Sequence, residues 1–145
     1  MTIERQETAR IAEPEGQDRT FSRAAEISRG MVGLVSRYTG RGPTKVRTTL
    51  NTNVALVVLE DMLAKGEQNL VAAGEVHAVA ALRKAYQVAM RGDAIELVES
   101  ILDRKVAAAL GDVDPARNVA VEVFVLERVP ETGITETAEY ADPSD

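Results

Sequence analysis

The sequence places Tyr38-Thr39-Gly40-Arg41-Gly42-Pro43-Thr44-Lys45-Val46-Arg47 between a predicted helix and a predicted strand. This stretch holds two glycines, a proline, two threonines and three cations, although the whole chain has a net charge of −6. Glycines let backbone N–H groups approach an anion closely, and they also set the backbone angles of a tight turn. The stretch therefore predicts either a turn alone or a turn that also binds an anion or an acidic surface. The candidate ligand- or partner-binding residues are Tyr38, Gly40, Arg41, Gly42, Thr44, Lys45 and Arg47.

This loop departs from the two common phosphate-binding motifs. A P-loop ends in Gly-Lys-Ser/Thr and opens a helix, whereas Thr44-Lys45 leads into a predicted strand. The Gly40-x-Gly42 pair lacks the third glycine and the preceding strand of a dinucleotide-binding fingerprint. What remains is a generic set of groups that can bind an anion, namely the loop N–H groups, the forked guanidinium of Arg41 and the ammonium of Lys45.

A helix is predicted before the loop, from about Thr20 to Thr39. Thr20 is a suitable N-cap, and Gly40 suits the position just past the helix end. Gly30 and Gly33 indicate close approach of another backbone, such as a helix of a second subunit, rather than a hinge. The stripe that repeats at helical spacing comprises Phe21, Ala24, Ala25, Ser28, Met31, Val32, Val35 and Tyr38.

Two strands are predicted after the loop. Residues 46–51 alternate and are rich in β-forming types, which predicts a strand with Val46, Thr48 and Leu50 on one face. A turn at 51–53 leads into Val54-Ala55-Leu56-Val57-Val58-Leu59, which is apolar on both faces. Such a run is typical of a strand covered on both sides, and a small domain has few helices to cover both. The run therefore predicts a homodimer.

The rest of the chain predicts two further helices and a second hairpin. A short helix spans about 63–73 and ends at Gly74. A long helix spans about 75–103, and Gly92-Asp93, with Glu96 in capping-box position, predicts a kink or break in its middle. Residues 105–110 and 119–126 form the second hairpin around a turn-rich connection at 112–118. The order α-β-β-α-α-β-β predicts an α+β fold in which two β-hairpins form a four-stranded, largely antiparallel sheet packed with helices.

The domain limits and the composition suggest a cytoplasmic protein. We expect one α+β domain at residues 20–128, a disordered arm at 1–19 and an acidic disordered tail at 129–145. The chain has no cysteine, no apolar run near the roughly 20 residues of a membrane span, and no apolar signal-peptide segment at its N-terminus. Any membrane contact would be peripheral, at the inner face, without direct insertion.

Charge is distributed unevenly along the chain. Between Arg19 and Arg47 seven cations oppose one carboxylate, Glu26, so this segment carries +6 and the remainder must carry −12. Overall acidity argues against general nucleic-acid binding, and the polarity allows a local anion site or head-to-tail pairing of copies. The alternative for the cations of the first predicted helix is that they simply lie on its solvent-exposed face.

No catalytic or metal-binding constellation is present, so we expect no enzyme activity, no metal and no cofactor. His77 is the only histidine, and in a chain without cysteine it predicts a surface residue rather than a zinc ligand. Asp112-x-Asp114 with Asn118 lacks the third ligand, the glycine and the closing glutamate of a calcium loop, so it predicts a turn. Glu122 is expected to pair with a cation of the first helix or to contact solvent.

Several stretches of the chain carry a family resemblance. They are residues 38–47, then Val57-Val58-Leu59-Glu60-Asp61-Met62-Leu63, then Glu67-x-x-Leu70-Val71, and finally Asp112-Val113-Asp114-Pro115 leading to Val121-Glu122-Val123-Phe124-Val125-Leu126. Together, over about residues 27–127, they resemble the MpsC family, a small bacterial domain named for a sodium-translocating, membrane-potential-generating system. The resemblance implies a soluble accessory partner of a sodium- or bicarbonate-linked membrane system, and it supplies no catalytic residues.

Three functions follow as hypotheses. The first is a homodimeric, non-catalytic accessory domain beside a membrane transport-system protein. The second is a small-anion or nucleotide sensor that uses the Gly-Arg-Gly-Pro-Thr-Lys loop. The third is an RNA-binding α+β module, which the lack of aromatic platforms and of a GXXG clamp disfavours.

Overall fold

The computed structural model describes residues 15–128, and its elements follow the predicted order. They are α2 (Glu15–Thr39), β1 (Lys45–Leu50), β2 (Val54–Glu60), α3 (Lys65–Ala72), α4 (Val76–Leu102), β3 (Val106–Asp114) and β4 (Val119–Leu126). The four strands form one antiparallel sheet in the order β1-β2-β4-β3. The predicted α+β class and its two hairpins are therefore confirmed. Residues 1–14 and 129–145, where most of the arm and all of the tail were predicted, lie outside the described residues.

The first helix begins earlier than predicted. It starts at Glu15, five residues before Thr20, so the assignment of Thr20 as N-cap is wrong. No proline occurs between Pro14 and Pro43, so nothing in the backbone prevents the helix from extending towards the N-terminus. Its predicted end is confirmed, because Gly40 has a φ of 86° and its N–H donates to the carbonyl of Ser36 at 2.8 Å.

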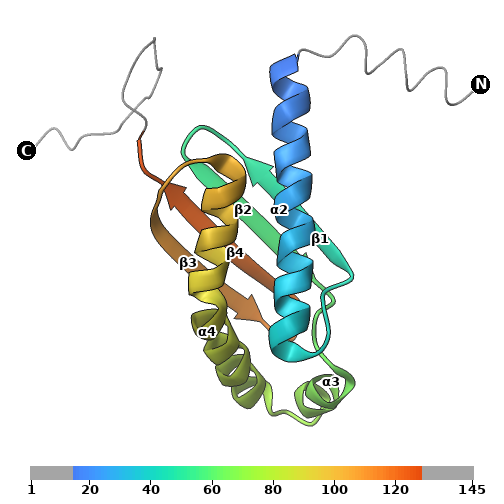
Figure 1. Ribbon diagram of the computed structural model, residues 1–145. Helices are drawn as coiled ribbons and strands as arrows, with labels where there is room; N and C mark the ends of the chain where they lie inside the picture. Colours follow the sequence, from blue (N-terminus) through green and yellow to red (C-terminus); the bar gives the residue numbers. More distant parts are fainter. Residues whose placement is uncertain (1–14, 129–145) are drawn as a thin grey trace, which may run out of the picture.

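The helices lie on one face of the sheet. In Figure 1, α2 and α4 run side by side across the strands, with α2 over β1 and α4 over β3, and α3 lies at one end of the molecule. Buried residues from both helices and from β2 and β4 form the core between these two layers. Its largest fully buried side chains are Phe124, Ile27, Met31, Leu63, Val57, Val79 and Val98.

Helix α4 is continuous, so the predicted break at Gly92-Asp93 is wrong. Its 27 residues span about 40 Å at 1.5 Å per residue. The buried positions recur every three or four residues through the expected break, and this continuous packing outweighs the local preference for a cap. Asp93 instead accepts a hydrogen bond from the Tyr38 hydroxyl at 2.8 Å. The buried positions are Val79, Arg83, Gln87, Met90, Ala94, Val98 and Leu102.

Gly30 packs closely against a side chain rather than a backbone, so the prediction for that position is wrong. A Cβ at Gly30 would lie 2.6 Å from Leu97 Cδ1 of α4. A Cβ at Gly33 would meet nothing within 4 Å. Gly30 therefore serves the packing of α2 on α4 within one chain.

Gly92→Ala is expected to stabilise the protein by about 0.5–1 kcal/mol, because alanine is the better helix former and its Cβ would meet nothing within 4 Å. Urea unfolding followed by circular dichroism measures this gain. Gly30→Ala is the matched control, and it should gain less because Leu97 must move. A loss of stability in Gly92→Ala would contradict the continuous helix.

The second face of the sheet has no described element over it. Strands β2 and β4 alternate strictly, and their buried residues point towards the helices. The intervening residues of β2 and β4 are half-buried and point the other way. We call this second surface the open face. Its apolar residues are Val54, Leu56, Val58, Ala108, Leu110, Val119, Val121, Val123 and Val125. The residues described thus cover the apolar run of β2 on one side only.

Candidate functional site

The predicted loop joins α2 to β1 in a compact turn. The Thr39 hydroxyl donates to the carbonyl of Val35 at 2.8 Å and accepts from the Arg41 N–H at 3.3 Å. A Cβ at Gly42 would lie 3.1 Å from the carbonyl oxygen of Val32, so the chain passes close to α2 there. The glycines thus serve turn geometry and close packing, as the turn interpretation requires.

Arg41 and Thr44 bind the segment that follows β2. Arg41 Nη1 donates to the carbonyl of Leu63 at 2.5 Å, and its Nη2 lies 3.3 Å from Asp61 Oδ1. The Thr44 hydroxyl donates to Asp61 Oδ2 at 2.7 Å. These hydrogen bonds, that of Thr44 first and that of Arg41 second, hold the pKa of the Asp61 carboxyl below its usual value.

Asn118 fixes the same segment from the opposite side. Its side-chain Oδ1 accepts the N–H groups of Met62 at 2.9 Å and Leu63 at 3.1 Å, and its carbonyl accepts the Asp61 N–H at 3.0 Å. Asp61 and Asn118 both have positive φ, 56° and 58°, which asparagine and aspartate tolerate better than most residues. We call this meeting point the loop corner: Arg41, Thr44, Asp61, Leu63 and Asn118.

The other predicted loop residues with charged or aromatic side chains lie outside the loop corner. Arg47 Nη2 lies 3.3 Å from Glu60 Oε2 on the neighbouring strand. Lys45 is exposed at the start of β1. Tyr38 donates to Asp93 of α4, which raises the pKa of the Tyr38 hydroxyl. Arg41 and Arg47 thus already face carboxylates of the same chain, and the anion-binding interpretation stays a prediction.

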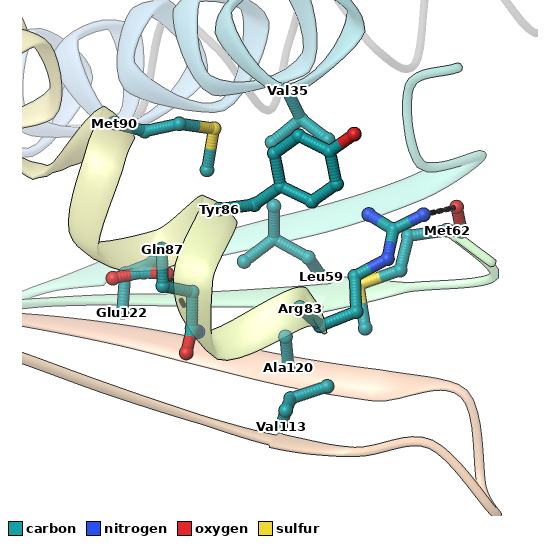
Figure 2. A pocket seen from close by; sticks show the side chains of 10 residues that line it. All are labelled: Val35, Leu59, Met62, Arg83, Tyr86, Gln87, Met90, Val113, Ala120 and Glu122. Atoms are coloured by element: carbon teal, nitrogen blue, oxygen red, sulfur yellow. Dashed lines mark hydrogen bonds between the residues drawn. The ribbon is translucent and has the colours of Figure 1, made fainter. Parts of the chain in front are cut away.

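A nearly buried ion pair lies next to the corner and was not predicted. Arg83 Nε and Nη2 donate to the two carboxylate oxygens of Glu67 at 2.8 and 2.6 Å. Figure 2 shows the further hydrogen bond from Nη2 to the Met62 carbonyl, which is 3.1 Å long. Burial raises the pKa of Glu67, but the hydrogen bonds from Arg83 and from the Ala64 N–H outweigh it, so the net shift is downward. This pair fixes α3 against α4.

Glu122 is buried, so the prediction that it pairs with the first helix or contacts solvent is wrong. It lies on the helix-facing side of β4, where Gln87 Nε2 of α4 donates to its Oε2 at 2.8 Å (Figure 2). Burial is the main cause that raises the pKa of Glu122 to about 7. A Cβ at Gly111 would lie 2.7 Å from Glu122 Oε1, so this glycine makes room for the carboxyl group.

A small cavity separates these two polar groups. Its volume is about 20 Å³, room for roughly one water molecule. Figure 2 shows Arg83 and Tyr86 on one side of it and Gln87 with Glu122 on the other. A cavity of this size is too small for a nucleotide or another organic cofactor.

The remaining sequence candidates lie elsewhere in the fold. His77 is exposed on α4, as predicted. Strand β3 extends to Asp114, so Asp112 and Asp114 belong to the strand and the predicted connection at 112–118 shortens to a turn at Pro115–Asn118. Within residues 15–128 no three acidic or histidine side chains are grouped to hold a metal ion. In that same part of the chain, no helix has both the length and the apolar character needed to cross a membrane.

Asn118→Ala is expected to destabilise the protein by about 2–3 kcal/mol, because two N–H groups lose their acceptor and alanine tolerates the positive φ poorly. Asn118→Asp is the matched control, since it keeps an acceptor at the same place and should lose much less. Thermal and urea unfolding measure both. Equal losses in the two variants would contradict the role assigned to Oδ1.

Comparison with known proteins gives one match. The family model described as "Na+-translocating membrane potential-generating system (MpsC)" matches residues 21–128. Searches of curated proteins and of solved structures found no match. The matched range takes in the whole sheet, all of α3 and α4, and the loop corner. The chain therefore belongs to the MpsC family.

Proposed function

We propose that this protein is a non-catalytic accessory component of a sodium- or bicarbonate-linked membrane transport system, and that it acts from the cytoplasmic side. The observation that carries the proposal is the family match over residues 21–128, because the family is described as a Na+-translocating membrane potential-generating system. A role beside other proteins also suits a chain whose described helices include none that could span the membrane itself.

The use of the ionisable groups within the fold supports binding rather than catalysis. Glu67 is held by Arg83, and Glu122 is covered by α4 and bonded to Gln87. A general acid or base must reach a substrate, and neither carboxylate is placed at an accessible site. The open face, in contrast, offers apolar surface to another protein.

Membrane vesicles from a host strain that lacks the gene test this proposal. The sodium-dependent membrane potential is recorded with a voltage-sensitive dye, with and without added purified protein. We expect the wild-type chain to increase the dye response in sodium buffer and to have no effect when potassium replaces sodium. Identical responses with and without the protein would contradict an accessory role.

The small-anion or nucleotide sensor remains the second candidate. Its supporting observation is that Lys45, which follows the loop at the start of β1, is exposed. Against it, an anion at Arg41 or Arg47 would have to displace Asp61 or Glu60. Thermal-shift measurements with phosphate, bicarbonate and ATP separate the two functions, since a bound ligand raises the unfolding midpoint. We expect no saturable shift; one that Lys45→Ala abolishes would favour the sensor.

A further inference from the structure

The side chains of the open face form aligned rows across the sheet. The strand register places one residue of each strand in each row. The first row is Lys45, Glu60, Val119 and Asp114; the second is Arg47, Val58, Val121 and Asp112; the third is Thr49, Leu56, Val123 and Leu110. Apart from Glu60 in the first row, the middle strands are therefore apolar, and the other charged residues of these rows lie on the two edge strands.

The two edge strands carry opposite charge at matching positions along the strand direction. Strand β1 presents Lys45 and Arg47, and strand β3 presents Asp114 and Asp112 in the same two rows. Half of the Asp114 side chain and most of the Asp112 and Arg47 side chains are exposed. Arg47 pairs with the partly exposed Glu60 and Asp114 pairs with Arg117, whereas Asp112 pairs with Lys84 of α4, on the helix-covered side of the sheet. Pairs between partly or fully exposed side chains rearrange at little cost, and Asp112 must leave Lys84 to face a partner copy.

We propose that the open face binds a second copy of this chain, with a two-fold axis parallel to the strands. Rotation about that axis brings β1 of each copy over β3 of the other. Each row of residues then lies over the same row of the partner copy. Arg47 then faces Asp112 of the partner copy, and Lys45 faces Asp114 of the partner copy. The valines of β2 and β4 pack against each other in the centre, as in aligned sheet packing.

The charge arrangement selects this partner and this orientation. An axis perpendicular to the strands would place β1 on β1 and β3 on β3, so the positive edge of one copy would not face the negative edge of the other. An unrelated partner would need its own matching pattern, whereas a second copy supplies it by symmetry. A face with these strand and residue spacings measures roughly 20 Å by 20 Å, so a dimer would bury on the order of 1,000 Å² in total. We therefore expect association at micromolar concentration.

A lysine substituted at the centre of the open face tests whether this surface forms the dimer interface. In sedimentation velocity the full-length wild type should reach the mass of two 15.6-kDa chains at micromolar concentration. Val123→Lys should stay monomeric, because it buries two charges in the apolar centre. Val88→Lys is the matched control, since Val88 is 65% exposed on α4, and it should dimerise like the wild type. Circular dichroism checks that each variant is folded.

A charge swap tests the orientation and the identity of the partner. Arg47→Glu and Asp112→Arg should each weaken dimerisation by about tenfold, because each sets like charges together in both symmetric contacts. When the two variants are mixed, each contact again joins opposite charges, and the affinity should return close to that of the wild type.

Three outcomes would overturn the proposal. The first is a wild-type protein that remains monomeric at high micromolar concentration. The second is a Val123→Lys variant that dimerises as well as Val88→Lys. The third is a mixture of the two charge variants that associates no better than either alone. None of these measurements involves the membrane system, so the dimer and the accessory role can fail independently.

Discussion

Replacing Arg83 by alanine is expected to lower the free energy of unfolding by about 3–5 kcal/mol. The side chains of Arg83 and Glu67 are only 6% and 11% exposed, and both Glu67 oxygens accept hydrogen bonds from the guanidinium, their only cationic donor among these contacts. Without Arg83, the carboxylate stays largely buried and unpaired, and the Met62 carbonyl loses a donor as well. The loss should loosen the contact between α3 and α4 in particular.

Urea unfolding at neutral pH measures this loss, with the neighbouring residue as control. Lys84→Ala removes an exposed pair with Asp112, 3.2 Å apart, and should cost less than about 1 kcal/mol. The double variant Arg83→Met/Glu67→Leu should recover most of the stability, because no unpaired charge then remains. Equal losses of unfolding free energy for Arg83→Ala and Lys84→Ala would show that the buried pair stabilises the protein no more than an exposed pair does.

The stability of the wild type should fall as the pH rises, and Glu122 is the reason. Its pKa is about 7 in the fold, above the ordinary value of 4.5, so the folded state holds a proton that the unfolded state releases. The contribution is complete below about pH 4.5 and is lost as the pH passes about 7. Between pH 5 and pH 8 we expect a loss of about 2–3 kcal/mol.

The variant Glu122→Gln isolates this effect. Glutamine cannot ionise and can still accept the Gln87 amide, so its stability should change little over the same pH range. The carboxylates with lowered pKa, Asp61, Glu67 and Asp112, lose their contributions only as the pH falls below their ordinary values. Urea midpoints at both pH values give the comparison, and parallel pH profiles for the wild type and the variant would contradict the assignment.

Most of the fold could be predicted from short-range patterns. Alternation in β1 and β4, the apolar run of β2, and glycines at positions 40 and 74 correctly indicated strands and helix ends. The break at Gly92-Asp93 was wrong because local capping preferences do not include the burial that runs along α4. The early start of α2 was missed because its first turn lacks the apolar stripe on which the prediction relied.

The candidate site was predicted only in part. The loop residues were found because glycine, proline and cations stand out in an acidic chain, and Arg41 and Thr44 do meet at the loop corner. The partners of Arg83 and Glu122 lie 16 and 35 positions away in the sequence, which periodicity does not reveal. One feature of the sequence did indicate that Arg83 is buried: it lies at the same helical spacing as the buried apolar residues of α4.

The sheet has one closed face and one open face. Helices α2 and α4 seal the closed face, and the open face presents aligned valines between edges of opposite charge. Binding through the open face would leave the core and the loop corner unchanged. The same surface would then position two copies for their role beside a membrane protein.

Methyl NMR over a dilution series tests this division most directly. We predict that the methyl resonances of Val121, Val123 and Leu56 shift with protein concentration, while those of the core residues Val57 and Val98 stay fixed. Resonances of the open face that are independent of concentration, or shifts confined to the helix surface or the core, would contradict the claim that this chain binds through its uncovered sheet.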